Sequence, residues 1–452
     1  MPKKAKSIKT KKGIELKIVN PNSAGIDIAD TEMQVYVPSD RDGENNRRFG
    51  SFTRDLGEIS SWLRACGIET IAMEATGIYW LPLFFRLQDD GFEVMLCNAR
   101  EVKGISEKKT DESDAEWLML LHQYGLLKPS FQPGNAARQI RNLSRHRNSL
   151  LHSASREILH MQKAMEQMNI KLTNVLSDIV GASGMRIITA ILSGNHDADS
   201  LSQLADGRCK RSREDIALSL EGTWDADHIF ELKQSFELYQ TYQSKVSECE
   251  MEIKKLLQAY VAKIDTDVNE LKRSKKCVSK KNAVSFDVES YAYAVWGVNA
   301  MNIPGMSTGS LLELIGEIGH DFVYKFETPS KFCRWCNLVP NNKISGGKII
   351  SSRVPTRKNP VGQIFRLCAN SVARSNNTMG YYFRRIKSRN GHMSAIVATA
   401  HKIAEVFYIM VRDKVEYDEK RVGQDEITIL RKKIERTQRT LELLNAKLYK
   451  SA

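Results

Sequence analysis

The sequence predicts a mixed α/β domain at its N-terminal end, an all-helical, coiled-coil-like region after it, and a second, mainly helical domain beyond. Between residues 23 and 131, short apolar runs alternate with amphipathic segments, which is typical of α/β domains. Two long helical patterns follow. A chain of 452 residues with 42% hydrophobic residues is also long enough to form two or three separate cores.

The N-terminal domain is expected over residues 23–132. Its predicted strands are Ala24–Ala29, Met33–Val37, Arg48–Phe52, Thr70–Glu74 and Glu93–Cys97. Its predicted helices are Asp55–Cys66 and Leu81–Asp89. Three strands followed by alternating helices and strands is the order of an RNase H-like (RuvC-like) domain. Pro129 and Pro133 mark its end.

The remaining chain is predominantly helical. Arg138–Asn169 and Ile229–Ala262 are predicted to form an antiparallel pair within residues 133–300, suited to dimerisation. Residues 301–415 are expected to form the second domain, in which Asn341–Lys348 is interpreted as a flexible polar loop. Residues 416–452 carry an apolar stripe typical of a short coiled coil. Residues 1–22 are interpreted as a basic arm without structure.

The net charge of +13 and the pI of about 9.2 favour a polyanionic partner, most simply nucleic acid. Lys272–Lys281 is a basic run that is expected to form a mobile loop facing nucleic acid. The arginines after residue 133 are either backbone contacts or an ordinary solvated helix face. No apolar run is long enough to predict a membrane span, and scattered cysteines indicate a reduced, cytoplasmic protein. Cys333 and Cys336 are interpreted as core residues rather than zinc ligands.

Four carboxylates stand in positions that suit metal binding. Asp27 and Glu74 end predicted strands, while Asp111 and Asp114 open a helix. Carboxylate oxygens are the ligands that Mg²⁺ prefers, and paired ions stabilise both the attacking and the leaving oxygen of a phosphodiester. Acids in a first helical turn also suit the helix dipole, so Asp111 and Asp114 have an ordinary structural explanation. Asp27 has a weaker one, since aspartate is depleted in strands.

Two further motifs have both a functional and an ordinary interpretation. The Pro304-Gly305 turn before an apolar helix either offers backbone N–H groups to a phosphate or is a simple corner. Ser345, beside two glycines, is ordinary loop composition, and no histidine nearby in the sequence supplies a base for a serine nucleophile.

The chain resembles the DEDD-type insertion-sequence transposases of the "one-ten" and "eleven-eleven" groups. Four segments carry the resemblance, in the same order as in that family: Gly25–Ala29; Met73–Tyr79; Lys109–Ala115; and Ile303-Pro304-Gly305 running through Leu338-Val339-Pro340 to Ser345-Gly346. One departure is Met306-Ser307, where the family has a second glycine in its Pro-Gly-x-Gly turn.

The resemblance implies an RNase H-like domain that binds Mg²⁺, or Mn²⁺ in its place, through Asp27, Glu74, Asp111 and Asp114. It implies a catalytic serine at Ser345. The implied partners are DNA, as element ends and target, a structured guide RNA from the element, and further copies of the chain in a dimer or tetramer. Candidate nucleic-acid contacts are Arg100, Lys103, Lys109, Arg138, Arg141, Arg145, Lys348 and Arg353.

Two other functions remain open at this point. A junction-resolving nuclease would use the same four acids with a metal-activated water. A catalytically decayed nucleic-acid-binding protein would keep the charge without the chemistry. Formation of a covalent protein–DNA adduct separates the three.

Overall fold

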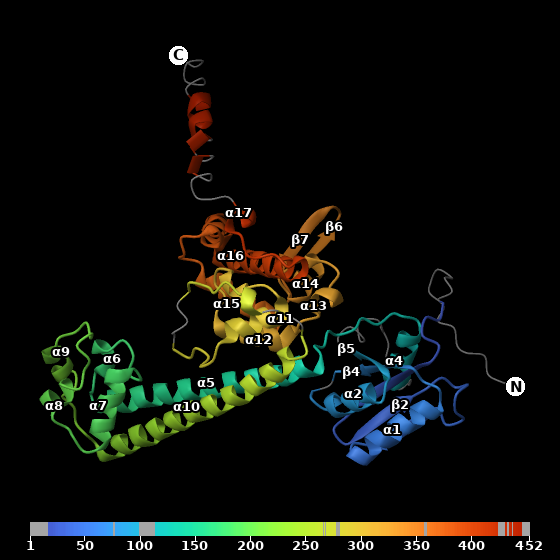
Figure 1. Cartoon of the computed structure of the whole chain (residues 1–452), viewed down its shortest axis with the longest axis horizontal. Helices are drawn as coiled ribbons and strands as arrows, with labels where there is room; N and C mark the ends of the chain where they lie inside the picture. The colour runs from blue at the N-terminus through green and yellow to red at the C-terminus, as the bar shows by residue number, and fades with distance from the viewer. Residues whose placement is uncertain are drawn as a thin grey trace. The chain divides into compact units, whose positions relative to one another are not determined.

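A computed structural model describes residues 17–75, 77–98, 114–264, 266, 268–276, 281–356 and 359–423, and parts of 430–444 (Figure 1). The chain divides into two compact units, Met1–Gln132 and Pro133–Ala452. The first is mixed α/β, and the described part of the second is mostly helical. Asp111, Arg100, Lys103 and Lys109 lie outside the described residues.

The first unit is built on a five-stranded sheet with the strand order β3-β2-β1-β4-β5. The strands are β1 Ser23–Ile28, β2 Glu32–Tyr36, β3 Asn46–Gly50, β4 Thr70–Glu74 and β5 Glu93–Cys97. The pairs β1–β2 and β2–β3 are antiparallel, and β1–β4 and β4–β5 are parallel. The predicted strands are confirmed to within two residues at each end.

Helices cover both faces of this sheet. On one face, α1 (Thr53–Ala65) and α2 (Trp80–Asp89) bury apolar side chains against Ile26 and Met73. On the other, α4 (Asp114–Gln123) packs Leu118 and Leu121 against Ala72. Successive residues of a strand point to opposite faces, so both faces of β1 and β4 are enclosed. This explains why the two strands read as apolar runs.

The second unit begins with two long helices, α5 (Asn135–Gln167) and α10 (Ala226–Val261). They lie side by side and antiparallel (Figure 1). Four short helices between them form a small apolar core with the ends of the pair: α6 (Leu172–Val175), α7 (Ala182–Leu192), α8 (Ala198–Ser202) and α9 (Arg213–Leu218). The predicted helical pair is therefore present.

The rest of the second unit is a bundle around buried aromatic rings. Its helices are α11 (Val288–Trp296), α12 (Thr308–Ile318), α13 (Phe322–Lys325), α14 (Pro329–Trp335), α15 (Pro360–Ser371), α16 (Thr378–Asp413) and α17 (Glu419–Val422). Short 3₁₀ turns lie at Val268–Glu270 and Ala300–Asn302. Phe322 stacks on Phe407, and Trp296 meets Phe407 edge to face. Cys333 of α14 and Cys336, which follows the last residue of that helix, are fully buried, which confirms their assignment as core residues.

Within the described residues, α16 is the one helix long and apolar enough to cross a membrane by length and composition. Half of its apolar window is buried inside the unit. Its Ile403, Phe407 and Val411 are at most 1% exposed. The apolar face of α16 is therefore explained by the core that it completes.

One expectation about the second unit was wrong. Asn341–Lys348 is not an irregular loop, because β6 (Asn341–Ser345) and β7 (Lys348–Arg353) form an antiparallel hairpin. Over its described residues the run Lys272–Lys281 has no regular structure, and some of its cations also pair within the protein. Arg273 pairs with Asp287, and the Lys276 ammonium donates to the carbonyls of Met301 and Ile303. Lys281 likewise pairs with Asp178.

Candidate active site

Asp27 and Glu74 lie at the ends of neighbouring parallel strands. In the register of β1 and β4, Gly25 pairs with Ala72 and Ile26 pairs with Met73. Continuing this register by one residue sets Asp27 beside Glu74. Both side chains are half-buried. The carboxyl ends of parallel strands share one edge of a sheet, which is the common position for functional sites in α/β folds.

Both carboxylates belong to the face of the sheet that α4 covers. Gly25 and Asp27 share one face because side chains alternate along a strand. That face is in close contact with α4, since a Cβ on Gly25 would lie 2.1 Å from the carbonyl oxygen of Ala115. On β4, Ala72 packs against α4, so Glu74 has the same orientation.

The direction of α4 places its first residue towards these strand ends. At the other end of the helix, Nε2 of the buried His122 lies 2.8 Å from Oγ1 of Thr70, the first residue of β4. The His122 carbonyl accepts a hydrogen bond from the Asn20 amide, which precedes β1. Because the C-terminal end of α4 meets the beginnings of the strands, Asp114 faces their ends, and it is exposed there.

Glu116 of α4 contacts the sheet, and the sequence did not predict this contact. Its Oε1 accepts a hydrogen bond of 3.1 Å from the hydroxyl of Tyr36 on β2. Tyr36 pairs with Gly25, so this contact lies directly beside the closest approach of α4. In the sequence, Glu116 is one more acid near the start of the predicted helix. Its contact with another strand is visible in the tertiary structure alone.

These acids have the oxygen ligands that a divalent cation prefers, but the described side chains do not form a complete set of metal ligands. The donors at the strand edge are carboxylate oxygens, which match the preference of Mg²⁺ and Mn²⁺. Within the described residues, no three His, Cys, Asp or Glu side chains lie close enough to hold a metal ion. The fourth predicted ligand, Asp111, is outside those residues. Asp27, Glu74 and Asp114 would hold the ion together with it.

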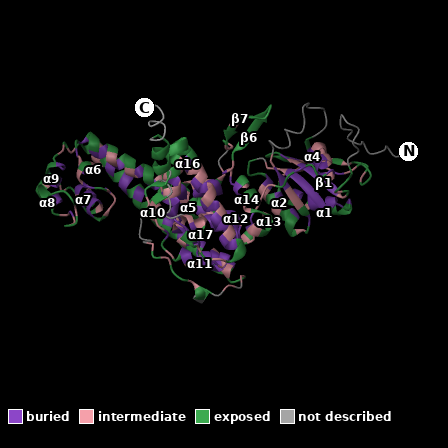
Figure 2. Ribbon diagram, turned by 90° about the horizontal axis from the view of Figure 1, so that it is seen from above, coloured by how far each residue is buried: buried purple, intermediate pink, exposed green. Residues whose placement is uncertain are grey.

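Ser345 ends β6 at the tip of the hairpin in the second unit. Gly346 and Gly347 have φ values of 54° and 76°, and they form a two-residue turn that pairs Ser345 with Lys348. Positive φ at both positions is what this tight turn requires, and glycine meets it without strain. Every residue from Asn341 to Ile350 is exposed, as the green hairpin in Figure 2 shows. In the part of the chain that the structure describes, the Ser345 hydroxyl has no hydrogen-bond partner.

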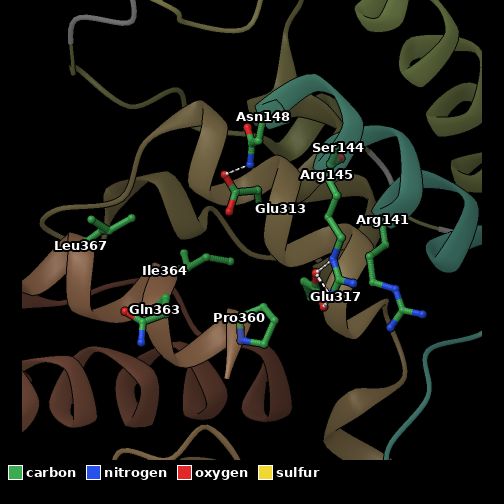
Figure 3. A pocket seen from close by; sticks show the side chains of 10 residues that line it. All are labelled: Arg141, Ser144, Arg145, Asn148, Glu313, Glu317, Pro360, Gln363, Ile364 and Leu367. Carbon is green, nitrogen blue, oxygen red and sulfur yellow. Dashed lines mark hydrogen bonds and ion pairs between the residues drawn. The ribbon is translucent and has the colours of Figure 1, made fainter. Parts of the chain in front are cut away.

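Several predicted nucleic-acid contacts in α5 have partners inside the protein. Arg145 forms a two-pronged ion pair with Glu317 of α12, with N–O distances of 2.7 and 3.0 Å (Figure 3). Arg138 donates to Asn135, and burial lowers the pKa of the Arg141 guanidinium. Arg147 is 4% exposed and pairs with Glu250 of α10 at 2.6 Å. This part of α5 therefore carries arginines that join helices.

The Pro304-Gly305 corner is closely packed in the same unit. Gly305 has a φ of 89°, and a Cβ there would lie 2.4 Å from the carbonyl oxygen of Cys368. The Ser307 hydroxyl caps α12 by accepting from the Ser310 N–H. Both observations favour the corner interpretation over a phosphate site. Lys348 pairs with Ser345 at the tip of the hairpin, whereas Arg353 pairs with Asn341 at its base, and both are exposed.

Comparison with protein families identifies the chain. Residues 24–170 match a family model of DEDD transposases of the IS110 type, described as Transposase. Residues 299–384 match a second one, described as Transposase IS116/IS110/IS902 family. A search of curated proteins found no match. The first match spans all four acids and the second spans Ser345, and together they cover about half of the chain. The protein belongs to the IS110-type transposases and is a DNA transposase of an insertion sequence.

Proposed function

We propose that this transposase cleaves and rejoins DNA strands with Ser345 as nucleophile and with Mg²⁺ held by Asp27, Glu74, Asp111 and Asp114. The observation that carries the proposal is the pair Asp27 and Glu74, placed side by side at adjacent strand ends on the α4 face. The sheet order β3-β2-β1-β4-β5 supports an RNase H-like fold for this unit. Acids at the strand ends of such a fold suit phosphodiester chemistry.

In this proposal Ser345 performs the covalent step. Its Oγ forms a bond to phosphorus while the bond from phosphorus to the leaving strand oxygen breaks. The serine proton passes to water, and the leaving oxygen takes up a proton. In the rejoining step, the hydroxyl of another strand attacks the phosphoserine and restores the Ser345 hydroxyl. Bound Mg²⁺ supplies stabilisation of negative charge on the transferring phosphoryl group.

The two parts of the site come from separate units of the chain, which suits a site assembled on the substrate. Asp27 and Glu74 belong to the first unit, and Ser345 belongs to the second. The proposal includes several copies of the chain and a structured RNA from the element as guide. The net charge of +13 supports an additional polyanionic partner beside DNA.

The exposure of Ser345 favours this function over a nuclease that uses metal-activated water. A serine with no packing role, held at a two-glycine turn, is placed to reach a large substrate. A water-based nuclease requires the acids but not this hydroxyl. Ser352 provides a matched control, since it is exposed on the same hairpin and pairs with Asn342.

The test is covalent adduct formation on labelled DNA carrying the element ends, with the RNA present, measured on denaturing gels. The wild-type chain and Ser352→Ala should form the adduct, while Ser345→Ala should bind DNA and form none. Cleavage by Ser345→Ala at a nearly normal rate would replace the mechanism with the nuclease. A wild-type chain that binds the DNA and neither cleaves it nor forms an adduct would indicate a decayed binding protein.

A further inference from the structure

A basic hollow lies between the end of α15 and the first half of α16. Its volume is about 870 Å³. The lining side chains include four basic residues and several short polar ones, and the basic residues are Arg374, Arg384, Lys387 and His392.

A break in α16 shapes this hollow. Gly391 has a φ of 82° and a ψ of 172°, which are not helical, so the helix divides at this residue. His392 and Phe383 have ring centroids 5.5 Å apart. In an unbroken helix, nine residues would separate them by about 13.5 Å along the axis. The break therefore turns His392 back towards Phe383, and together they form one wall.

The cations of the hollow are available to a ligand. Arg384 is held in place by Nη1, which donates to the carbonyls of Ala373 and Ser375. Arg374 and Lys387 are exposed, and neither has an ion-pair or hydrogen-bond partner among the residues that the structure describes. No Asp or Glu of the described chain lines the hollow. Its charge is therefore positive without an internal counter-ion.

A second hollow in the same unit shows the opposite arrangement (Figure 3). It measures about 220 Å³ and lies between α5, α12 and α15. Arg141 and Arg145 line it together with Glu313 and Glu317, and Glu317 pairs with Arg145. Burial raises the pKa of the Glu313 carboxyl. There the arginines are balanced by acids, whereas in the α15–α16 hollow they are not.

We propose that the α15–α16 hollow binds the phosphodiester backbone of a nucleic acid strand. Arg374 and Lys387 would contact successive phosphates, and the Nε and Nη2 donors of the fixed Arg384 would face the same strand. Backbone contacts of this kind set position and affinity without reading sequence. The proposal rests on the proposed function in that the partner is nucleic acid, but it does not depend on Ser345 chemistry.

The test is the salt dependence of binding, measured by fluorescence anisotropy on the full chain freed of nucleic acid. Each phosphate contact contributes about 0.9 to the slope of log affinity against log salt, or about eightfold in affinity per tenfold change in salt. Arg374→Gln with Lys387→Gln should lower the slope by about 1.8 on duplex DNA. The control Arg412→Gln with Lys331→Gln removes two cations that are also exposed but already pair with Asp413 and Glu327.

The two probes, a mixed-sequence DNA duplex and a structured RNA, distinguish the source of the phosphates. A lower slope confined to either probe, or seen with both, supports the hollow as a phosphate site and identifies the nucleic acid that it binds. Equal slopes for the double variant and its control would overturn the proposal, since net charge alone would then explain binding. Ser345→Ala should keep the wild-type slope, so failure of the serine mechanism is seen separately.

Discussion

The two parts of the proposed site are held in opposite ways. Asp27 is the next-to-last residue of β1 and Glu74 the last residue of β4, and both strands are packed on both faces. Gly25 approaches α4 so closely that no side chain fits between them. Ser345 ends a strand whose residues are all exposed, in a hairpin with no core of its own. An isolated two-stranded hairpin is marginally stable in water. The carboxylates are thus held by a packed core, whereas the serine is held by an exposed hairpin alone.

This difference fits the chemistry proposed for each part. Metal ligands must hold their separations within a few tenths of an ångström, which requires rigid elements. A nucleophile that enters a site on a bound substrate needs reach and exposure. Changes near the acids should therefore affect both stability and activity, whereas changes in the hairpin should affect activity alone.

The largest effect is expected from changing a carboxylate. Asp27→Asn keeps the shape of the side chain but removes the charge that would bind the metal. Since a bound metal contributes several kcal/mol to such reactions, single-turnover cleavage should fall by about 1,000-fold or more. Asp30→Asn, an exposed site just beyond β1, is the control and should cleave normally. Full wild-type activity in excess chelator would contradict the metal role.

The next effect compares how much a substitution beside the acids and a substitution in the β6–β7 hairpin lower the stability of the protein. A Cβ on Gly25 would lie 2.1 Å from the Ala115 carbonyl oxygen and 2.4 Å from the Met119 nitrogen, and neither backbone atom can move without shifting α4. Gly25→Ala should destabilise the first unit by about 1–3 kcal/mol. Ile349→Ser, on the exposed hairpin, should change stability by at most about 0.5 kcal/mol.

Hydrogen exchange followed by mass spectrometry measures both variants, because it reports the opening of each segment separately. Peptides covering β1 and β4 should exchange faster in Gly25→Ala. In Ile349→Ser these peptides and those of α14 to α16 should be unchanged. Equal protection of β1 in Gly25→Ala and the wild-type chain would show that α4 is not tightly packed there.

A further effect, of at most similar size, is a pH dependence at the other end of α4. Burial lowers the pKa of His122 to about 4, and its Nδ1 has no hydrogen-bond partner within the described structure. Below pH 6.5, the ordinary pKa of histidine, His122 binds a proton in the unfolded chain but stays neutral in the folded chain. Stability should therefore fall as the pH drops from about 6.5 to about 4, by at most about 3 kcal/mol.

His122→Gln isolates this contribution, since an amide can still bond to Thr70 but does not titrate. Urea unfolding between pH 7 and pH 5, followed by circular dichroism, should show a flatter pH dependence for the variant. This range lies above the ordinary pKa values of most carboxylates, so acid titration contributes little there. Parallel curves for the variant and the wild-type chain would remove His122 as the cause.

The strands and both strand-end acids were predictable because their signal is local. A short apolar run closed by Asp27 or Glu74 is visible in a few residues. The β6–β7 hairpin was missed because it buries nothing and so lacks the alternating pattern of a strand beside a core. Ile344 and Ile349 on either side of Gly346-Gly347 were the available signal, since a two-glycine link between such residues favours a tight turn.

The roles of the charged residues were decided by tertiary contacts. Arg145 was predicted as a nucleic-acid contact, and the sequence of its arginine-rich helix carries no sign of the acids that pair with Arg145 and Arg147 inside the protein. Glu317 and Glu250, which pair with them, lie 172 and 103 residues away in the chain. The α15–α16 hollow depends in the same way on the break at Gly391, which is an ordinary glycine in the sequence.

The sequence by itself determined the α/β order of the first unit, the long helical pair and the four acids and one serine that resemble a transposase. Each of these features depends on local periodicity or on a motif of adjacent residues. Only the tertiary structure decided that α4 runs with Asp114 towards Asp27 and Glu74, and which cations stay available to a phosphate. Those facts depend on packing between distant segments, where burial and pairing are settled by neighbours that local sequence does not specify.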